Sequence, residues 1–61
     1  MNEFQKCYDT LKNLCDIINA HSEYHYTVTD WVFGFILFEG DKQICNGNFA
    51  NVAHFLSGLM A

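Results

Sequence analysis

The chain of 61 residues and 7.0 kDa has room for one domain, and a chain this short buries only about 60% of its unfolded surface when it folds alone. A content of 51% hydrophobic and 16% aromatic residues excludes intrinsic disorder. Seven acidic residues stand against three lysines, with no arginine, and the net charge is −4. This balance argues against direct binding to nucleic acid and favours a protein partner with a basic surface.

The cysteine count and the N-terminus bear on the compartment. Cys7, Cys15 and Cys45 make an odd number, whereas small secreted scaffolds carry an even set. The N-terminus has no basic segment followed by an apolar one, and the longest apolar run, residues 31–38, is far too short to cross a membrane. We therefore expect a cytoplasmic protein that does not associate with membranes.

Apolar residues spaced by three and four positions predict an amphipathic helix over residues 4–18. Asn2 is a candidate N-cap for it, and Glu3 lies in the first turn, where the helix dipole favours a carboxylate. A second, shorter helix is predicted to begin at Phe49, with Asn48 as its N-cap.

Two strands are predicted after the first helix. Alternation of apolar and polar residues predicts a half-buried strand over residues 24–29, and the apolar run predicts a central strand over residues 31–38. The turn-prone pair Thr29-Asp30 is expected to connect them. That turn gives the pairs Val28 with Trp31 and Tyr26 with Phe33.

A second hairpin follows the central strand. Gly40 and Asp41 predict a type II′ turn that leads into a third strand over residues 42–46, with Glu39 opposite Lys42. This turn gives the pairs Leu37 with Ile44 and Phe35 with Asn46. Gly34, inside the apolar run, is expected to permit a bulge or a close neighbour.

These registers separate the strand residues onto two faces of one sheet. The face expected to form the core carries Tyr24, Tyr26, Val28, Trp31, Phe33, Phe35, Leu37 and Ile44. The other face carries His25, Thr27, Val32, Gly34, Ile36, Phe38, Gln43 and Cys45. We predict a single α+β domain over residues 1–61, in the order α-β-β-β-α, with a three-stranded antiparallel meander and both helices packed on one face of the sheet. The alternative places the helices on opposite faces.

A sheet face without helices would expose apolar side chains, which on a small protein usually marks an interface. We therefore predict a homodimer, because a second copy would cover that face. The predicted interface residues are Val32, Ile36, Phe38 and Cys45.

Two sets of residues raise the question of chemistry. Cys7, Cys15, His21 and His25 could suggest a zinc site, but the two cysteines are eight positions apart, and finger-type sites need two to four. Cys45 and His54 could form a thiolate–imidazole pair, but no orienting acid is evident nearby. We predict no catalytic residues, no metal site and no cofactor.

The acidic residues suggest how such a protein would act. Asp9 and Asp16 lie one heptad apart on the polar side of the first helix, and Glu23 could continue that line. A solvated helix surface is the plain interpretation, and a contact for a basic protein surface is the functional one.

These features predict a non-enzymatic protein-binding module, an inhibitor or regulator that occupies a partner's surface. In general character it is similar to the small acidic proteins by which phages and mobile elements block host enzymes. One alternative is an orphan structural subunit that docks on a larger complex through its apolar sheet face. The other is a minimal thiol or metal-dependent enzyme.

Overall fold

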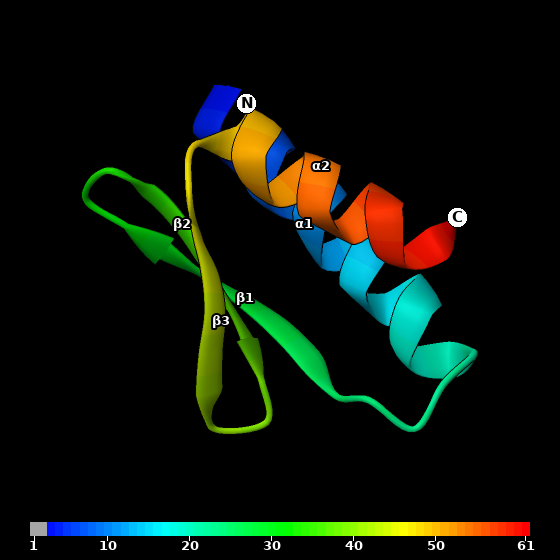
Figure 1. Ribbon diagram of the computed structural model, residues 1–61. Coiled ribbons are helices and arrows are strands. Elements are labelled where there is room, and N and C mark those ends of the chain that lie inside the picture. Colours follow the sequence, from blue (N-terminus) through cyan, green and yellow to red (C-terminus); the bar gives the residue numbers. More distant parts are fainter. Residues whose placement is uncertain (1–2) are drawn as a thin grey trace.

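The computed structural model describes residues 3–61 and has the predicted order of elements (Figure 1). The elements are α1 (Glu3–Ala20), β1 (Tyr26–Trp31), β2 (Gly34–Glu39), β3 (Lys42–Gly47) and α2 (Phe49–Met60). The strands form one antiparallel sheet in the order β1-β2-β3. The predicted α+β meander is confirmed.

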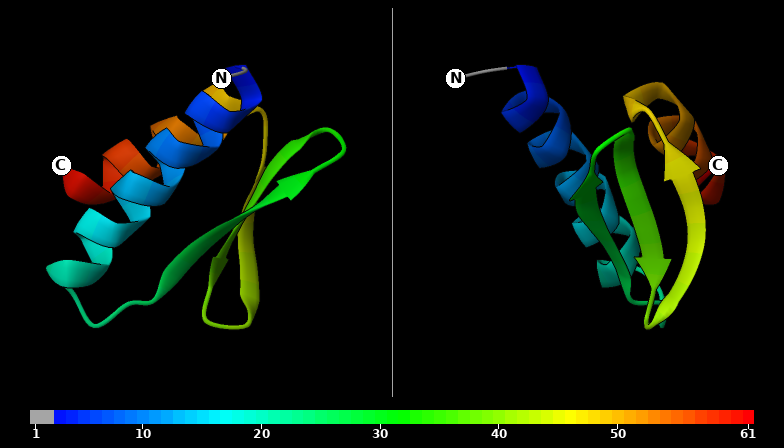
Figure 2. Two further views of the ribbon diagram at one scale, coloured as in Figure 1. Left: turned by 180° about the vertical axis from the view of Figure 1, so that it is seen from behind. Right: turned by 90° about the vertical axis from the view of Figure 1, so that its left-hand side faces the viewer.

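Both helices pack on the same face of the sheet. α1 lies against β1, α2 lies against β3 and β2, and the helices contact each other (Figure 1). The right-hand view of Figure 2 looks onto the opposite face, with the strands in front of both helices. The alternative with helices on opposite faces is thereby excluded.

The apolar stripe of α1 forms half of the helical layer. Leu11, Cys15 and Ile18 are buried one or two turns apart, as the spacing predicts. Close to the end of the helix, the side chain of Asn19 binds the start of β1. Its Nδ2 donates to the Tyr26 carbonyl oxygen (2.8 Å), and its Oδ1 accepts from the Tyr26 N–H (2.7 Å). The proposed cap Asn2 lies outside the described residues.

The start of α2 is fixed by a capping box. The Asn51 N–H donates to Asn48 Oδ1 (2.9 Å), and the Asn48 N–H donates to Asn51 Oδ1 (3.3 Å). These bonds satisfy N–H groups that have no partner within the helix. The predicted cap Asn48 is confirmed, and Val52 and Leu56 follow it into the core.

The β2–β3 hairpin turns at the predicted residues. Glu39 pairs with Lys42, and Gly40 has a φ of 61°, which fits the first central position of a type II′ turn. Further along, a β-bulge shifts the register, so the predicted pairs of Leu37 and Phe35 are wrong by one residue. Leu37 pairs with Cys45, and Phe35 pairs with Gly47.

The β1–β2 hairpin turns three residues later than predicted, at Val32 and Phe33 instead of Thr29-Asp30. Val28 therefore pairs with Leu37, and the predicted pair of Val28 with Trp31 is wrong. The turn depends on Gly34, which has a φ of 143°, a conformation that L side chains rarely adopt. A Cβ at Gly34 would collide with the Gly47 carbonyl group, so the expected close neighbour is the backbone of β3.

The core lies between the sheet and the two helices. Its buried members are Leu11, Cys15, Ile18, Tyr26, Val28, Phe35, Leu37, Val52 and Leu56. Phe4 stacks on Phe35 with ring centroids 5.2 Å apart. Three residues predicted for the core face are outside the core: Tyr24, Trp31 and Phe33. Tyr24 precedes β1, and the later turn moves Trp31 to the end of β1 and Phe33 into the connection.

Candidate functional site

The face of the sheet opposite the helices is the first candidate surface. No element within residues 3–61 packs on it, and its side chains come from alternate strand positions. We call it the uncovered face, and it consists of Thr27, Thr29, Trp31, Gly34, Ile36, Phe38, Gln43 and Asn46. Trp31, Ile36 and Phe38 are half-buried by their neighbours, and the polar members are exposed. None of these residues carries a charge.

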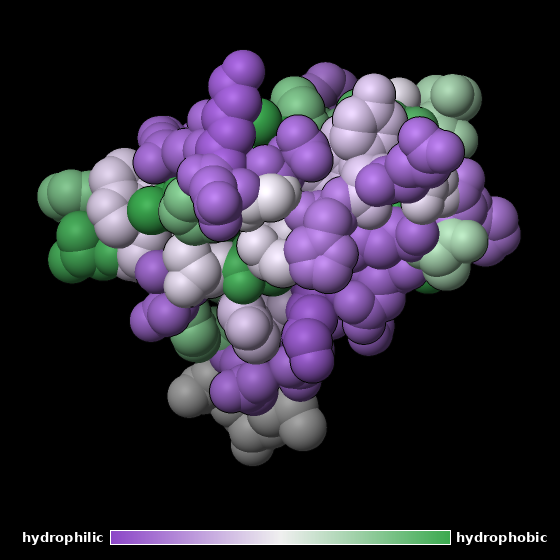
Figure 3. Space-filling model, turned by 90° about the horizontal axis from the view of Figure 1, so that it is seen from below, coloured by the Kyte–Doolittle hydropathy of each residue, from purple (hydrophilic) through white to green (hydrophobic). Residues whose placement is uncertain are grey.

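An exposed apolar tip continues this face. Val32 and Phe33, in the two-residue turn after β1, are 83% and 72% exposed. Phe33 meets Trp31 edge to face, with ring centroids 5.1 Å apart. We call Trp31, Val32 and Phe33 the aromatic tip. Figure 3 shows hydrophobic side chains gathered at the left-hand end of the molecule, where this turn lies, beyond a largely hydrophilic middle.

The predicted interface residues do not all lie on one surface. Ile36 and Phe38 are on the uncovered face, and Val32 is in the adjoining tip. Cys45 packs against the core together with Ile44, so its placement on the second face is wrong. The cause is the bulge, which sets both residues opposite Leu37 and turns both side chains toward the helices.

The acidic residues predicted to meet a basic partner are exposed but do not form one line. Asp9 and Asp16 are on α1, where Lys12 lies three positions after Asp9 and four before Asp16, on the same side of the helix. Glu23 is in the α1–β1 connection, because the helix ends at Ala20. A basic partner for these residues stays a prediction.

The thiols are held in apolar surroundings. Cys15 is 2% exposed, and burial, with a smaller contribution from Asp16, raises the pKa of its thiol to about 11. Cys7 packs at the edge of the core, and His54 is exposed on α2. Within residues 3–61 the structure brings together no three His, Cys, Asp or Glu side chains that could hold a metal ion.

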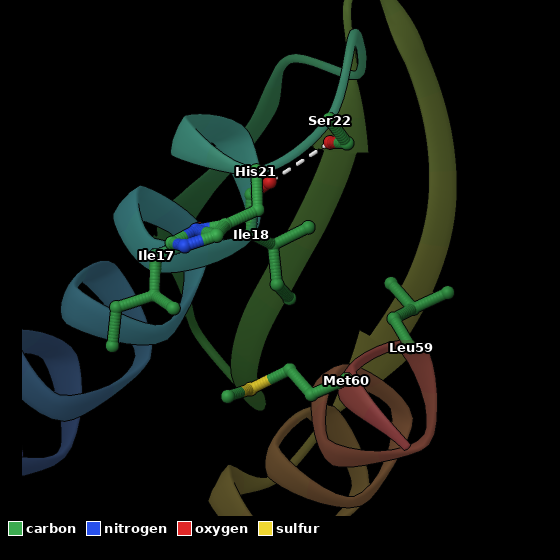
Figure 4. Close-up of a pocket in the computed structure, with 6 residues that line it drawn as sticks. All are labelled: Ile17, Ile18, His21, Ser22, Leu59 and Met60. Atoms are coloured by element: carbon green, nitrogen blue, oxygen red, sulfur yellow. Dashed lines mark hydrogen bonds between the residues drawn. The ribbon is translucent and has the colours of Figure 1, made fainter.

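A pocket of about 340 Å³ opens between the C-terminal ends of α1 and α2 (Figure 4). Ile18 and Met60 face each other across it, with Ile17 and Leu59 nearby. Its polar side chains are bonded to the end of α1. His21 Nδ1 lies 3.0 Å from the Ile17 carbonyl oxygen, and the Ser22 hydroxyl donates to the Ile18 carbonyl oxygen (2.8 Å). The volume suits a small ligand, but convergent polar groups that would orient one are not among its lining residues.

Comparison with known protein families, with curated proteins and with solved structures finds no match to this chain. Neither helix of the described chain combines the length and the apolarity needed to cross a membrane. The surfaces described above are therefore the features that point to a function.

The aromatic tip is the feature that sequence reasoning missed, because Trp31 and Phe33 were expected inside the core. Gly34 carried a usable signal. A glycine between two bulky residues and a new apolar run is typical of a strand boundary, whereas a continuous strand of eight residues would place it mid-sheet at a cost in stability.

Proposed function

We propose that this protein is a non-enzymatic protein-binding module whose binding surface is the uncovered face together with the aromatic tip. The observation that carries the proposal is the exposure of Val32 and Phe33 beside Trp31. Exposed aromatic and aliphatic side chains that join an apolar surface are typical of the anchors that dominate protein interfaces.

The residue types in the turn support this proposal. Two-residue hairpin turns ordinarily contain Gly, Asn or Asp, which adopt the required backbone conformations easily. Here the turn contains Val32 and Phe33, and neither side chain is buried in the core. Their apolar area contributes little to folding while it faces water, so contact with another molecule explains it better.

The chemistry of the uncovered face favours a protein over other ligands. Nucleic acid requires cationic side chains, and two of the lysines, Lys6 and Lys12, are on α1, while Lys42 is at the β2–β3 turn. A small molecule requires a concave site, and the pocket lies elsewhere, between the helix ends. A surface of hydroxyl, amide and apolar groups suits another protein surface.

Two substitutions of exposed apolar residues test the proposal. Immobilised wild-type protein, Val32→Asp and Ile17→Asp are compared for the proteins that each captures, its own copies included, from a lysate of the source cells. Ile17 is 47% exposed and lies on α1, away from the tip, so it provides a matched control. Capture that is lost in Val32→Asp and kept in Ile17→Asp supports the proposal, and equal capture by all three overturns it.

A further inference from the structure

The polar residues of the uncovered face share one chemical property. Thr27, Thr29, Gln43 and Asn46 carry hydroxyl or amide groups, each of which both donates and accepts hydrogen bonds. Such a group can pair with its own copy across a two-fold axis, whereas a carboxylate or an ammonium group repels its copy. The uncovered face therefore carries no group that would repel its own copy.

The distribution of charge favours the same partner. The chain carries a net charge of −4, and the charged residues all lie outside the uncovered face. A basic protein would gain no electrostatic attraction from this surface. A second acidic copy would meet the least repulsion here, because every acidic group stays on other surfaces.

Each edge of the sheet is interrupted at one place, which disfavours strand pairing along it and favours the face as the contact surface. At β1, the Asn19 amide occupies the outward N–H and C=O of Tyr26. At β3, a bulge interrupts the edge between Gln43 and Cys45. Blocked and bulged edges are features that prevent edge-to-edge association.

We propose that a second copy of this chain covers the uncovered face, sheet against sheet, with the helices on the outside of the dimer. The inference rests on the proposed function, since it names the partner of that same surface. Stacked sheets lie about 10 Å apart, so Ile36, Phe38 and Trp31 of each copy would interdigitate between them.

The size of the face sets the expected affinity. Three strands of six residues cover about 14 by 20 Å. The area of this rectangle is well below the roughly 800 Å² of surface that each partner buries in a standard interface. The tip enlarges the contact only modestly. We therefore expect a weak, reversible dimer.

Sedimentation equilibrium of the reduced protein, from about 1 to about 500 μM, tests the dimer with a matched pair of variants. Thr29 is exposed on the uncovered face beside Ile36, whereas Thr10 is exposed on α1. Thr29→Glu should raise the dissociation constant by about 100-fold or more, because it places a carboxylate without a partner in the buried contact, and Thr10→Glu should change it less than about 3-fold. Circular dichroism confirms that both variants are folded.

Hydrogen exchange distinguishes face packing from edge pairing. Because the Tyr26 N–H points away from β2, the N–H groups of Val28 and Asp30 point outward as well. Face packing leaves their exchange unchanged between dilute and concentrated protein. Strong protection of these two amides on association would overturn the proposed arrangement.

The remaining outcomes separate the two proposals. A wild-type protein that is monomeric at every concentration overturns the second copy as partner. A dimer that Thr29→Glu leaves intact overturns the uncovered face as the surface through which the copies meet. If capture in the lysate experiment still depends on Val32, the binding module stands with a different partner. If capture is also indifferent to Val32→Asp, both proposals fail.

Discussion

The two faces of β2 differ in burial although their side chains are similarly apolar. Leu37 is fully buried and Phe35 is 4% exposed, whereas Ile36 and Phe38, which alternate with them, are only half-buried. The difference arises from the position of the helices and not from the hydrophobicity of the strand. An apolar run on both sides of a strand is therefore not enough to show that the same chain covers both sides.

The connections decide which face is covered. β3 ends at Gly47 and α2 begins at Phe49, so the chain has one residue in which to leave the sheet. α1 is tied to β1 through the Asn19–Tyr26 bonds. The two helices lie side by side over the same face, and the described chain has no third helix that could cover the opposite face (Figure 2). The asymmetry of β2 is therefore built into the topology.

The largest expected effect compares neighbours on opposite faces. Leu37→Ala should lower the free energy of unfolding by about 3 kcal/mol, because it removes a fully buried side chain and leaves a cavity. Ile36→Ala should cost less than about 1 kcal/mol, because Ile36 is in partial contact with water. Urea unfolding of both variants measures the difference, with Thr29→Glu as the common background so that a dimer does not contribute. Equal losses would contradict the asymmetry of the two faces.

The sequence predicted the faces of β1 and β2 better than their pairing. The true turn pairs Val28 with Leu37 instead of Trp31, a shift of six residues. Because the shift is even, each side chain keeps its side, and Tyr26, Val28 and Leu37 are buried as expected. A residue that lies in a different strand from the predicted one can change sides. Trp31 was predicted in the central strand on the core face, and it lies at the end of β1 on the uncovered face. The alternation of residues in the sequence determines which face of the sheet a side chain lies on. The position of the turn depends on a tertiary contact, which this alternation does not reveal.

That contact is the approach of Gly34 to β3, and it provides the second prediction. Gly34→Ala should lower the free energy of unfolding by about 2–3 kcal/mol, since the φ of 143° is strained for alanine and the Cβ would collide with the Gly47 backbone. Gly58→Ala is the control, because its Cβ would have open space and alanine favours a helix, so stability should rise by about 0.5–1 kcal/mol. Thermal unfolding measures both. A neutral Gly34→Ala would mean that the tip is not fixed by this contact, and the position of Trp31 would then be in doubt.

The bulge in β3 marks a second limit of sequence reasoning. Gly40, Asp41 and the Glu39–Lys42 pair were enough to predict the turn, because turn chemistry is local. A bulge responds to the packing of two side chains on one neighbour, and nothing in the spacing of Ile44 and Cys45 reveals it. The predicted placement on the second face of the sheet is consequently correct for Ile36 and Phe38 and wrong for Cys45.

Burial of Cys15 gives a third prediction, which concerns the covered side alone. The pKa of its thiol is about 11 in the folded protein and about 9.0 when exposed. Between these pH values the unfolded chain has released the proton and the folded chain retains it. The free energy of unfolding should therefore be unaffected below pH 9 and fall by about 2 kcal/mol as the pH rises from 9 to 11.

The control for this pH dependence is Cys15→Val, which keeps an apolar side chain of similar size and has no thiol. Subtracting its unfolding curve removes the contributions of all other ionisable groups, which are the same in both proteins. The difference should decrease steadily above pH 9. A flat difference would show that the thiol is reached by water, and the covered face would then be less tightly closed than its 2% exposure indicates.

The smallest expected effect concerns the edge where the two faces meet. Asn19→Ala removes both bonds to Tyr26 and should lower the free energy of unfolding by about 1–1.5 kcal/mol relative to Asn13→Ala, an exposed position of the same helix. The comparison cancels the gain in helix propensity, because both variants replace Asn with Ala in α1. The variant also frees the outward N–H and C=O of Tyr26, so the β1 edge becomes open to strand pairing. Sedimentation should then detect species larger than a dimer in Asn19→Ala and not in Asn13→Ala. If the two variants match in stability and in size, the two bonds of the Asn19 amide neither stabilise the fold nor protect the β1 edge.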